Sequence, residues 1–286
     1  MHPLSVPAPD GLPEHLASLG RTLVMGILNV TPDSFSDGGE HDTPEAAIAH
    51  ARALVAAGAD IIDVGGESTR PGAARVAPDE EARRVLPVVR ALAAEGVCVS
   101  IDTMRAEVAA EAVAAGAVIV NDVSGGLADP AMGATAARAR TALGAPPVVV
   151  AMHWRAHSAT MNALAEYDDT ARDVARELGA AIEALQAAGV ERSRLVADPG
   201  LGFAKDATHN WELLARWDDL AGLGLPILIG ASRKRFTAAL GQDRDDVTAA
   251  ITAYSALRGA WCVRVHDAAA SAAAVRTVEA IAGHAR

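Results

Sequence analysis

A single pattern repeats along the chain and limits the folds that it can adopt. Each unit has a short run of β-branched and other apolar residues, a polar or glycine-rich break and an alanine-rich amphipathic stretch. Such a unit predicts a strand, a loop and a helix. The predicted strands cover residues 23–28, 60–64, 97–101, 118–120, 148–152, 195–197, 227–229 and 262–265. The predicted helices cover 44–57, 79–95, 104–115, 131–143, 168–188, 209–221, 245–258 and 268–282, and glycines 58, 96, 116 and 189 follow four of them.

Strands that alternate with helices pair in parallel, and two architectures are built in this way. Eight such units in about 250 residues match the size of a closed (β/α)8 TIM barrel. The alternative is an open doubly wound sheet, but no G-x-G-x-x-G turn follows the first predicted strand. We therefore expect one α/β TIM barrel over residues 21–286, with long loops after strands 1 and 2. Residues 1–20 are expected to be a loosely ordered N-terminal leader.

Composition excludes several classes of function. The 286 residues are 51% hydrophobic, enough for a sizeable core, and their net charge of −11 argues against a nucleic-acid partner. No apolar run approaches the roughly 20 residues of a membrane span, and no basic segment followed by an apolar block begins the chain. Cys98 and Cys262 lie in apolar runs, which is typical of buried thiols in a reducing compartment. We expect a cytoplasmic protein that binds neither nucleic acid nor membrane.

Polar side chains occur where most of the predicted strands end. In a TIM barrel these carboxyl ends meet at one mouth, where catalytic groups gather. One such residue alone can be a helix N-cap, and His153 fits a structural role as well as a ligand contact. As a set, Asp102, Asn121 and Asp198 offer acceptors to a planar heterocycle with a guanidine-like edge, because a carboxylate accepts two parallel N–H bonds from such an edge.

A second group of residues suits an anion. Thr69 and Arg70 lie in the loop after the second strand, and Arg264 and His266 come from the end of the eighth. Arg70 alone is equally consistent with a solvated loop charge. Because the net charge of −11 repels anions, a bound phosphate needs a local cluster of this kind. The four residues together predict an anion site beside the heterocycle.

The loop after the first strand, NVTPDSFSDGGEHD (29–42), is polar and longer than most such connections. Asp33 and Asp37 within it are suited to holding a cation, guiding a proton or capping a turn. Phe35 has no apolar neighbour in the loop, so its ring either packs into the barrel mouth or covers a ligand. We expect the loop to act as a lid.

Lysine is scarce in this sequence. Of 25 basic residues apart from histidine, only Lys205 and Lys234 are lysines. A composition biased toward arginine keeps lysine mainly where a compact, flexible ammonium is needed, although chance also leaves some. We expect Lys234 to be intolerant of arginine. For Lys205 a loop position permits a solvated role, and we expect a milder effect there.

Eight ordered motifs, one at each strand end, resemble those of dihydropteroate synthases. They are MGILNVTPDSFSDGG (25–39), DVGGESTRPGA (63–73), SIDT (100–103), NDVSGG (121–126), MH (152–153), DPGLGFAK (198–205), GASRKRF (230–236) and RVHD (264–267). A string such as SRK or DPG means little alone. The ordered set, which spans about residues 22–282, is a specific signal.

The resemblance implies an activity and a role for each matching residue. The activity is condensation of 6-hydroxymethyl-7,8-dihydropterin diphosphate with 4-aminobenzoate, giving 7,8-dihydropteroate and pyrophosphate. The pterin-binding residues would be Asp102, Asn121, Asp198 and Lys234. The diphosphate-binding residues would be Thr69, Arg70, Arg264 and His266, with Arg264 also lying against the pterin plane. The aminobenzoate site and its lid would contain Phe35, Asp33, Asp37, Pro71, Phe203 and Ser232. Asn29 would help to position Mg²⁺ on the diphosphate.

The resemblance further implies that the diphosphate departs before the amine attacks, and that late helices form a homodimer. The first point suits a sequence with no evident serine–histidine–aspartate pattern or activated cysteine. Two alternatives stay open. One is a pterin-binding methyltransferase that uses a cobalt cofactor, against which the diphosphate-type residues count. The other is a catalytically silent pterin-binding paralogue.

Overall fold

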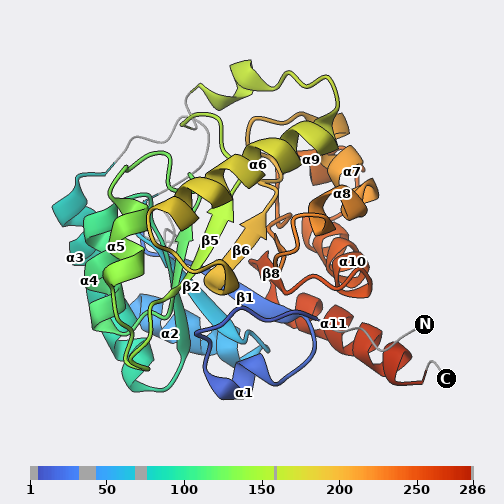
Figure 1. The fold of residues 1–286 in the computed structure, drawn as a ribbon. Coiled ribbons are helices and arrows are strands. Elements are labelled where there is room, and N and C mark those ends of the chain that lie inside the picture. The colour runs from blue at the N-terminus through green and yellow to red at the C-terminus, as the bar shows by residue number, and fades with distance from the viewer. Residues whose placement is uncertain (1–5, 32–42, 68–75, 158–159, 285–286) are drawn as a thin grey trace.

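The protein is a closed barrel of parallel strands surrounded by helices (Figure 1). The computed structural model describes residues 6–31, 43–67, 76–157 and 160–284. The strands pair in the order β6-β5-β4-β3-β2-β1-β8-β7, and a parallel bridge between Ala197 and Ile227 joins β6 to β7. The predicted TIM barrel is confirmed, and the open doubly wound sheet is excluded.

The strands begin and end within a residue or two of the predicted positions. They are β1 (Leu23–Asn29), β2 (Ile61–Gly65), β3 (Cys98–Asp102), β4 (Ile119–Asp122), β5 (Val148–Met152), β6 (Leu195–Asp198), β7 (Leu228–Ile229) and β8 (Cys262–Val265). The helices are α1 (Glu14–Ala17), α2 (Pro44–Ala56), α3 (Pro78–Ala94), α4 (Ala106–Ala115), α5 (Met132–Arg138), α6 (Thr170–Ala187), α7 (Ala207–Ala215), α8 (Trp217–Ala221), α9 (Arg235–Ala238), α10 (Arg244–Leu257) and α11 (Ala268–Gly283), with 3-10 turns η2 (Met161–Leu164) and η3 (Arg192–Arg194).

Local chemistry explains several helix boundaries. Pro44 begins α2, and the Thr43 side chain accepts a hydrogen bond from the Ala46 amide, which caps the first turn. The four glycines expected after helices all have positive φ, from 80° at Gly96 to 123° at Gly116.

Two predicted helices differ in the structure. The helix expected over 209–221 is divided into α7 and α8 at Arg216, whose ψ of 47° is not helical and whose guanidinium binds Asp169 and Asp219. The helix expected over 131–143 ends at Arg138, because the next residue, Ala139, is extended with ψ of 151°.

Alternate strand residues face the inside and the outside of the barrel. One apolar cluster fills the barrel interior at the amino ends of the strands and includes Met25, Ile61, Val150, Val196 and Leu228. The residues next to these along the strands pack outward against the helices in two further clusters. The interior is therefore packed at the amino ends of the strands, and the remaining inward positions, near the carboxyl ends, are those free to carry polar groups.

The N-terminal segment packs beneath this core. Leu12 and Leu16 are buried in the inner cluster, and the Asp10 amide donates to the Ser193 carbonyl. Arg21 makes two hydrogen bonds to Asp60, of 2.7 and 2.8 Å, directly before β1. From residue 6 onward, the stretch expected to be a loose leader thus contacts the barrel, while the domain boundary near residue 20 stays a prediction.

Within the described part of the chain, none of the helices combines the length and apolar character that crossing a membrane requires. Cys98 and Cys262 are buried and unbridged, as expected for core thiols, and burial raises the pKa of Cys98 to about 12.

Candidate functional site

Strand register brings the expected polar side chains to one level of the barrel. Asn29 of β1 pairs with Gly65 of β2, which in turn pairs with Asp102 of β3. Asp102 pairs with Asn121 of β4. On the other side of the barrel Asp198 of β6 pairs with Met152 of β5. The carboxyl ends of these strands therefore carry the acceptors predicted for a heterocycle.

A hydrogen-bonded network joins four strands at this level. Arg264 of β8 donates through Nε to Asp63 Oδ2 at 2.5 Å and through Nη2 to Asp102 Oδ2 at 2.6 Å. Asn121 Nδ2 donates to the same Asp63 oxygen at 3.0 Å. Arg264 was expected to face a diphosphate. In the structure its guanidinium binds Asp63 and Asp102, of which Asp102 belongs to the heterocycle set. Charge-assisted bonds of this kind hold the side chains in one arrangement.

Sequence reasoning did not single out Asp63 as a site residue. Its side chain is fully buried, and its Oδ1 has no hydrogen-bond partner among the described residues. A buried, unsatisfied carboxylate oxygen is costly unless a ligand or water donates to it. The available signal was a charged residue inside the apolar run IIDVG, two positions before the strand ends. Asp63 thus belongs to the acceptor set.

Burial perturbs both carboxylates predicted for the site. It raises the pKa of Asp102 to about 7, although the nearby Arg264 charge opposes the shift. It also raises the pKa of Asp198, against the opposing effect of Lys234. Asp198 Oδ1 accepts a 2.7 Å hydrogen bond from the Gly200 amide, which orients the carboxylate. Perturbed carboxylates of this kind gather at functional sites.

Lys234 lies beside Asp198, directly before α9. Its Nζ donates to the Leu201 carbonyl and lies 4.6 Å from the centre of the Phe203 ring. Burial lowers the pKa of Lys234 to about 8, and Asp198 opposes this shift. At Gly230 an added Cβ would come within 3.9 Å of both Lys234 Nζ and Asp198 Oδ2, so the glycine keeps the space beside them open.

Ser232 and His266 contact each other at the same end of the barrel. Ser232 Oγ lies 2.9 Å from His266 Nδ1 and accepts a hydrogen bond from the His266 amide at 3.1 Å. The predicted aminobenzoate residue and the predicted diphosphate residue are in this way linked by one pair of hydrogen bonds.

Several predicted residues lie outside the described part of the chain. They are Asp33, Phe35 and Asp37 of the first loop, and Thr69, Arg70 and Pro71 of the second. The two described ends of the second loop are joined: Arg105 binds the Glu67 carboxylate at 2.7 Å and also the Val76 carbonyl. Glu81 of α3, which is buried, binds the same guanidinium. A small hollow of about 10 Å³ separates this cluster from Asp102.

The match to known proteins agrees with this geometry. The model of the pterin-binding enzyme family matches residues 25–266, from within β1 to just past the end of β8. The chain is 51% identical over 274 residues to a dihydropteroate synthase of Mycobacterium leprae, covering 92% of this chain and 94% of that one.

The chain belongs to the pterin-binding enzyme family.

Solved structures of relatives have the same fold. One is a Xanthomonas albilineans dihydropteroate synthase with 4-aminobenzoic acid, with a TM-score of 0.83 and 43% identity, covering 91% of this chain and 93% of that one. Another is the dihydropteroate synthase from the same organism in complex with 7,8-dihydropteroate, with a TM-score of 0.80 and 42% identity, covering 91% and 94%. The pterin-binding fold is thus shared over almost all of the described barrel.

A second polar cluster of this pterin-binding enzyme lies behind the loop after β6. Lys205 is only 4% exposed, so its predicted solvated role is wrong. Its Nζ lies 2.8 Å from His153 Nδ1, and His153 Nε2 lies 2.9 Å from Glu177 Oε2 of α6. His153, for which a structural role and a ligand contact were both open, is 1% exposed and has both ring nitrogens paired within the protein. Its contacts are structural.

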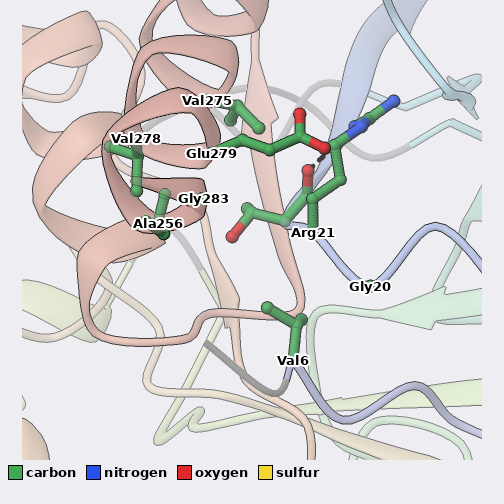
Figure 2. Close-up of a pocket in the computed structure, with 10 residues that line it drawn as sticks. Val6, Gly20, Arg21, Ala256, Val275, Val278, Glu279 and Gly283 are labelled. Atoms are coloured by element: carbon green, nitrogen blue, oxygen red, sulfur yellow. Dashed lines mark hydrogen bonds between the residues drawn. The ribbon is translucent and has the colours of Figure 1, made fainter. Parts of the chain in front are cut away.

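An apolar hollow of about 200 Å³ lies at the opposite end of the barrel from this site, next to the residues that precede β1. Figure 2 shows the residues that line it: Val275 and Val278 of α11, Ala256 of α10, and Val6 and Gly20 of the N-terminal segment. It lies at the amino ends of the strands, where the inward side chains are apolar, and therefore we do not assign the pterin site to it.

Proposed function

We propose that this pterin-binding enzyme is a dihydropteroate synthase. It condenses 6-hydroxymethyl-7,8-dihydropterin diphosphate with 4-aminobenzoate and releases 7,8-dihydropteroate and pyrophosphate. The observation that carries the proposal is the convergence of buried carboxylates, an amide and a partly buried lysine at the carboxyl mouth of the barrel. The relatives that this chain matches over nine tenths of its length are named as synthases of this kind.

The acceptor set suits the donor-rich edge of the pterin. Asp102 and Asp198 accept N–H bonds from the ring edge, and Asn121 accepts or donates through its amide. The free oxygen of Asp63 accepts one further N–H bond. Lys234 donates to ring oxygen and nitrogen. Because the groups are held by hydrogen bonds before the substrate arrives, little order has to be created on binding.

The first chemical step in this proposal breaks the bond between the pterin methylene carbon and the diphosphate oxygen. The electron pair leaves with the diphosphate, where Arg264 and His266, together with Thr69 and Arg70, stabilise the negative charge. The remaining pterin cation is delocalised over the ring. Ionised Asp102, beside that ring, stabilises the positive charge.

The second step joins the arylamine to the pterin carbon. The nitrogen lone pair of 4-aminobenzoate forms the new bond, and the amine then loses a proton to solvent or to pyrophosphate. Phe203, Ser232 and Pro71 line the slot for the ring, and the loop that carries Phe35, Asp33 and Asp37 covers it. Such covering is needed because water would otherwise capture the cation.

Magnesium is the proposed metal ion. Asn29 ends β1 beside Gly65, and its amide oxygen is a suitable ligand for a hard cation. The described residues contain no group of three histidine, cysteine, aspartate or glutamate side chains that could hold a metal alone. Asn29 would therefore share an ion whose other ligands are diphosphate oxygens and water. There the ion would offset the charge of the leaving group.

An assay separates this proposal from its alternatives. Purified protein is incubated with the pterin diphosphate, Mg²⁺ and 4-aminobenzoate, and pyrophosphate and dihydropteroate are measured. Release of both products that depends on both substrates supports a synthase. Methyl transfer from a reduced folate to a cobalt cofactor, with no pyrophosphate released, would favour the methyltransferase. Pterin binding without either reaction would identify a silent paralogue.

We also propose that the enzyme is a cytoplasmic homodimer built through its late helices. The two buried, unbridged cysteines support a reducing compartment. Exposed Leu257 of α10 and Ile281 of α11 give the late helices apolar surface suited to a second copy. Sedimentation velocity would test the dimer, and a concentration-independent monomer would contradict it.

A further inference from the structure

Side chains hold four carbonyls of the loop from Pro199 to Lys205. Lys205 Nζ donates to the carbonyls of Gly200 and Phe203, at 3.1 and 3.0 Å. Lys234 donates to the Leu201 carbonyl from the other side, and the Tyr167 hydroxyl donates to the Ala204 carbonyl at 2.9 Å. Both lysines of the chain thus bind the same loop.

The backbone of this loop needs such support. Gly200, Gly202 and Ala204 have φ values of 66°, 77° and 48°, so every second residue is in the left-handed region. For Ala204 this conformation carries a steric cost, which persists only where the surrounding structure enforces it. The alternation turns the carbonyls of the loop toward the two ammonium groups. Loop shape and lysine contacts therefore depend on each other.

The third partner of Lys205 is His153. Burial lowers the pKa of Lys205, and the charges of Asp198 and Glu177 oppose this shift. In its ammonium form Lys205 only donates, so His153 Nδ1 then accepts at 2.8 Å, and the ring proton lies on Nε2, where it is donated to Glu177. Burial, reinforced by the Lys205 charge, lowers the pKa of His153 to about 4, which agrees with a neutral ring. Glu177 is in turn fixed by Arg155 at 2.7 Å. All three ammonium hydrogens of Lys205 then have acceptors.

We propose that Lys205 is a positioning residue of the synthase site: oriented by His153 and Glu177, its ammonium fixes the loop that presents the Phe203 ring and the Leu201 carbonyl to Lys234. Lys205 itself contacts neither substrate. Its influence reaches the arylamine side of the site through Phe203. This inference rests on the proposed function, because that function assigns Phe203 to the aminobenzoate slot.

The geometry also explains why lysine is retained at this position. Three acceptors surround one compact nitrogen in a space that is 4% exposed. A planar guanidinium cannot direct its donors in this way and needs more volume. Lys205→Arg is therefore expected to be as damaging as Lys205→Met, contrary to the milder effect that a solvated loop residue would show.

Kinetics of Lys205→Met test the proposal. The carbonyls of Gly200 and Phe203 lose their donor, so we expect KM for 4-aminobenzoate to rise about tenfold or more. Affinity for 6-hydroxymethylpterin should change less than about threefold, because most of the protein groups proposed to bind the pterin lie on strands rather than in this loop. Tyr254→Phe is the control. It removes a comparable 2.6 Å bond to the Leu214 carbonyl near the end of α7, which is not a carbonyl of the loop, and should change thermal stability without changing either constant.

If Lys205→Met does not fold, Tyr167→Phe tests the loop instead, because it removes only the bond to the Ala204 carbonyl. A rise in aminobenzoate KM is again expected. Unchanged KM in a folded Lys205→Met protein, or equal loss of both ligands, would overturn the proposal. So would unchanged KM in Tyr167→Phe if Lys205→Met cannot be studied.

A spectroscopic measurement needs no turnover. In nitrogen-15 NMR of the wild-type protein at neutral pH, His153 should be neutral, with its proton on Nε2. A proton on Nδ1 would mean that Lys205 does not donate there, and the proposal would fail even in an active enzyme. If the protein makes no dihydropteroate but His153 has the expected tautomer, the proposed function fails, and the arrangement around Lys205 stands.

Discussion

Lys234 is the residue at which side-chain geometry matters most. Its single nitrogen reaches the Leu201 carbonyl and the face of Phe203 while lying beside Asp198. Each of these contacts depends on a compact, flexible ammonium rather than on charge alone.

We predict that Lys234→Arg lowers turnover by about a hundredfold or more, because the planar guanidinium of arginine cannot occupy the position of a single ammonium group. Steady-state kinetics with both substrates would measure the loss. Arg233→Lys is the matched control: Arg233 is the neighbouring residue, half exposed, and binds Asp245. It should keep wild-type turnover. Near-normal activity of Lys234→Arg would refute the role given to the ammonium.

The pH dependence of the reaction follows from two perturbed groups. Burial raises the pKa of Asp102 to about 7 and lowers that of Lys234 to about 8. The proposed mechanism uses ionised Asp102 and protonated Lys234. The value of kcat/KM for the pterin diphosphate should therefore fall as pH drops through about 7 and again as it rises past about 8. Asp198, whose pKa burial also raises, would steepen the acid limb.

A pH–rate profile of the wild-type protein, with Asp102→Asn for comparison, would check this. The variant should be slower and should lose most of the acid limb, because its amide does not titrate. A wild-type profile that is flat from about pH 6 to 9 would show that neither group has the assigned role.

At the scale of elements, strand ends supply the rigid groups and loops supply the adjustable ones. Asp63, Asp102, Asn121 and Arg264 lie on four strands and bind one another directly. The loops after β6 and β7 meet above them, where Gly202 packs against the stem of Lys234. The contact is close: a Cβ at Gly202 would lie 2.7 Å from Lys234 Cδ.

Gly202→Ala is therefore expected to displace Lys234 and remove most activity. Its φ of 77° also adds strain of about 1–2 kcal/mol to the folded state. Gly241→Ala controls for that strain, since Gly241 has φ of 67° and would place its Cβ within 4 Å of no other atom. Urea unfolding should show that both variants are destabilised, because both carry the backbone strain. Equal kcat/KM values in the two would contradict the proposed packing role of Gly202.

The sequence predicted the strand ends well because apolar runs stop where solvent or a ligand begins. Asp102, Asn121 and Asp198 were identified for that reason. Asp63 was not, because it lies within a strand buried on both faces, and such a run does not reveal which residues point inward. The environment of Lys205 was equally hidden, since His153 is 52 residues away along the chain and meets it only through the barrel.

At the scale of the whole molecule, stability and chemistry occupy opposite ends of the barrel. The amino end is closed by the apolar interior cluster, to which the N-terminal segment adds Leu12 and Leu16. The carboxyl end holds the buried charges. Changes at the first end should alter the free energy of unfolding with little effect on substrate binding.

Leu16→Ala tests this separation. Leu16 is 6% exposed, and its truncation should lower the free energy of unfolding by about 2–5 kcal/mol. KM for both substrates should stay unchanged at temperatures where the variant is folded. Leu19→Ala, at a position that is 39% exposed, should cost about 0.5 kcal/mol or less. A change in KM with Leu16→Ala would show that the two ends are coupled.

The scarcity of lysine limits the side chains at which an amine-directed acylating reagent can react. Its side chains offer such a reagent two primary amines, and the environment of Lys205 shields one of them. Lys234, with its pKa lowered to about 8, has a larger reactive free-base fraction near neutrality than an ordinary lysine. A mild acylating probe would thus mark one side chain of the folded protein, and protection from labelling would report occupancy of the pterin site.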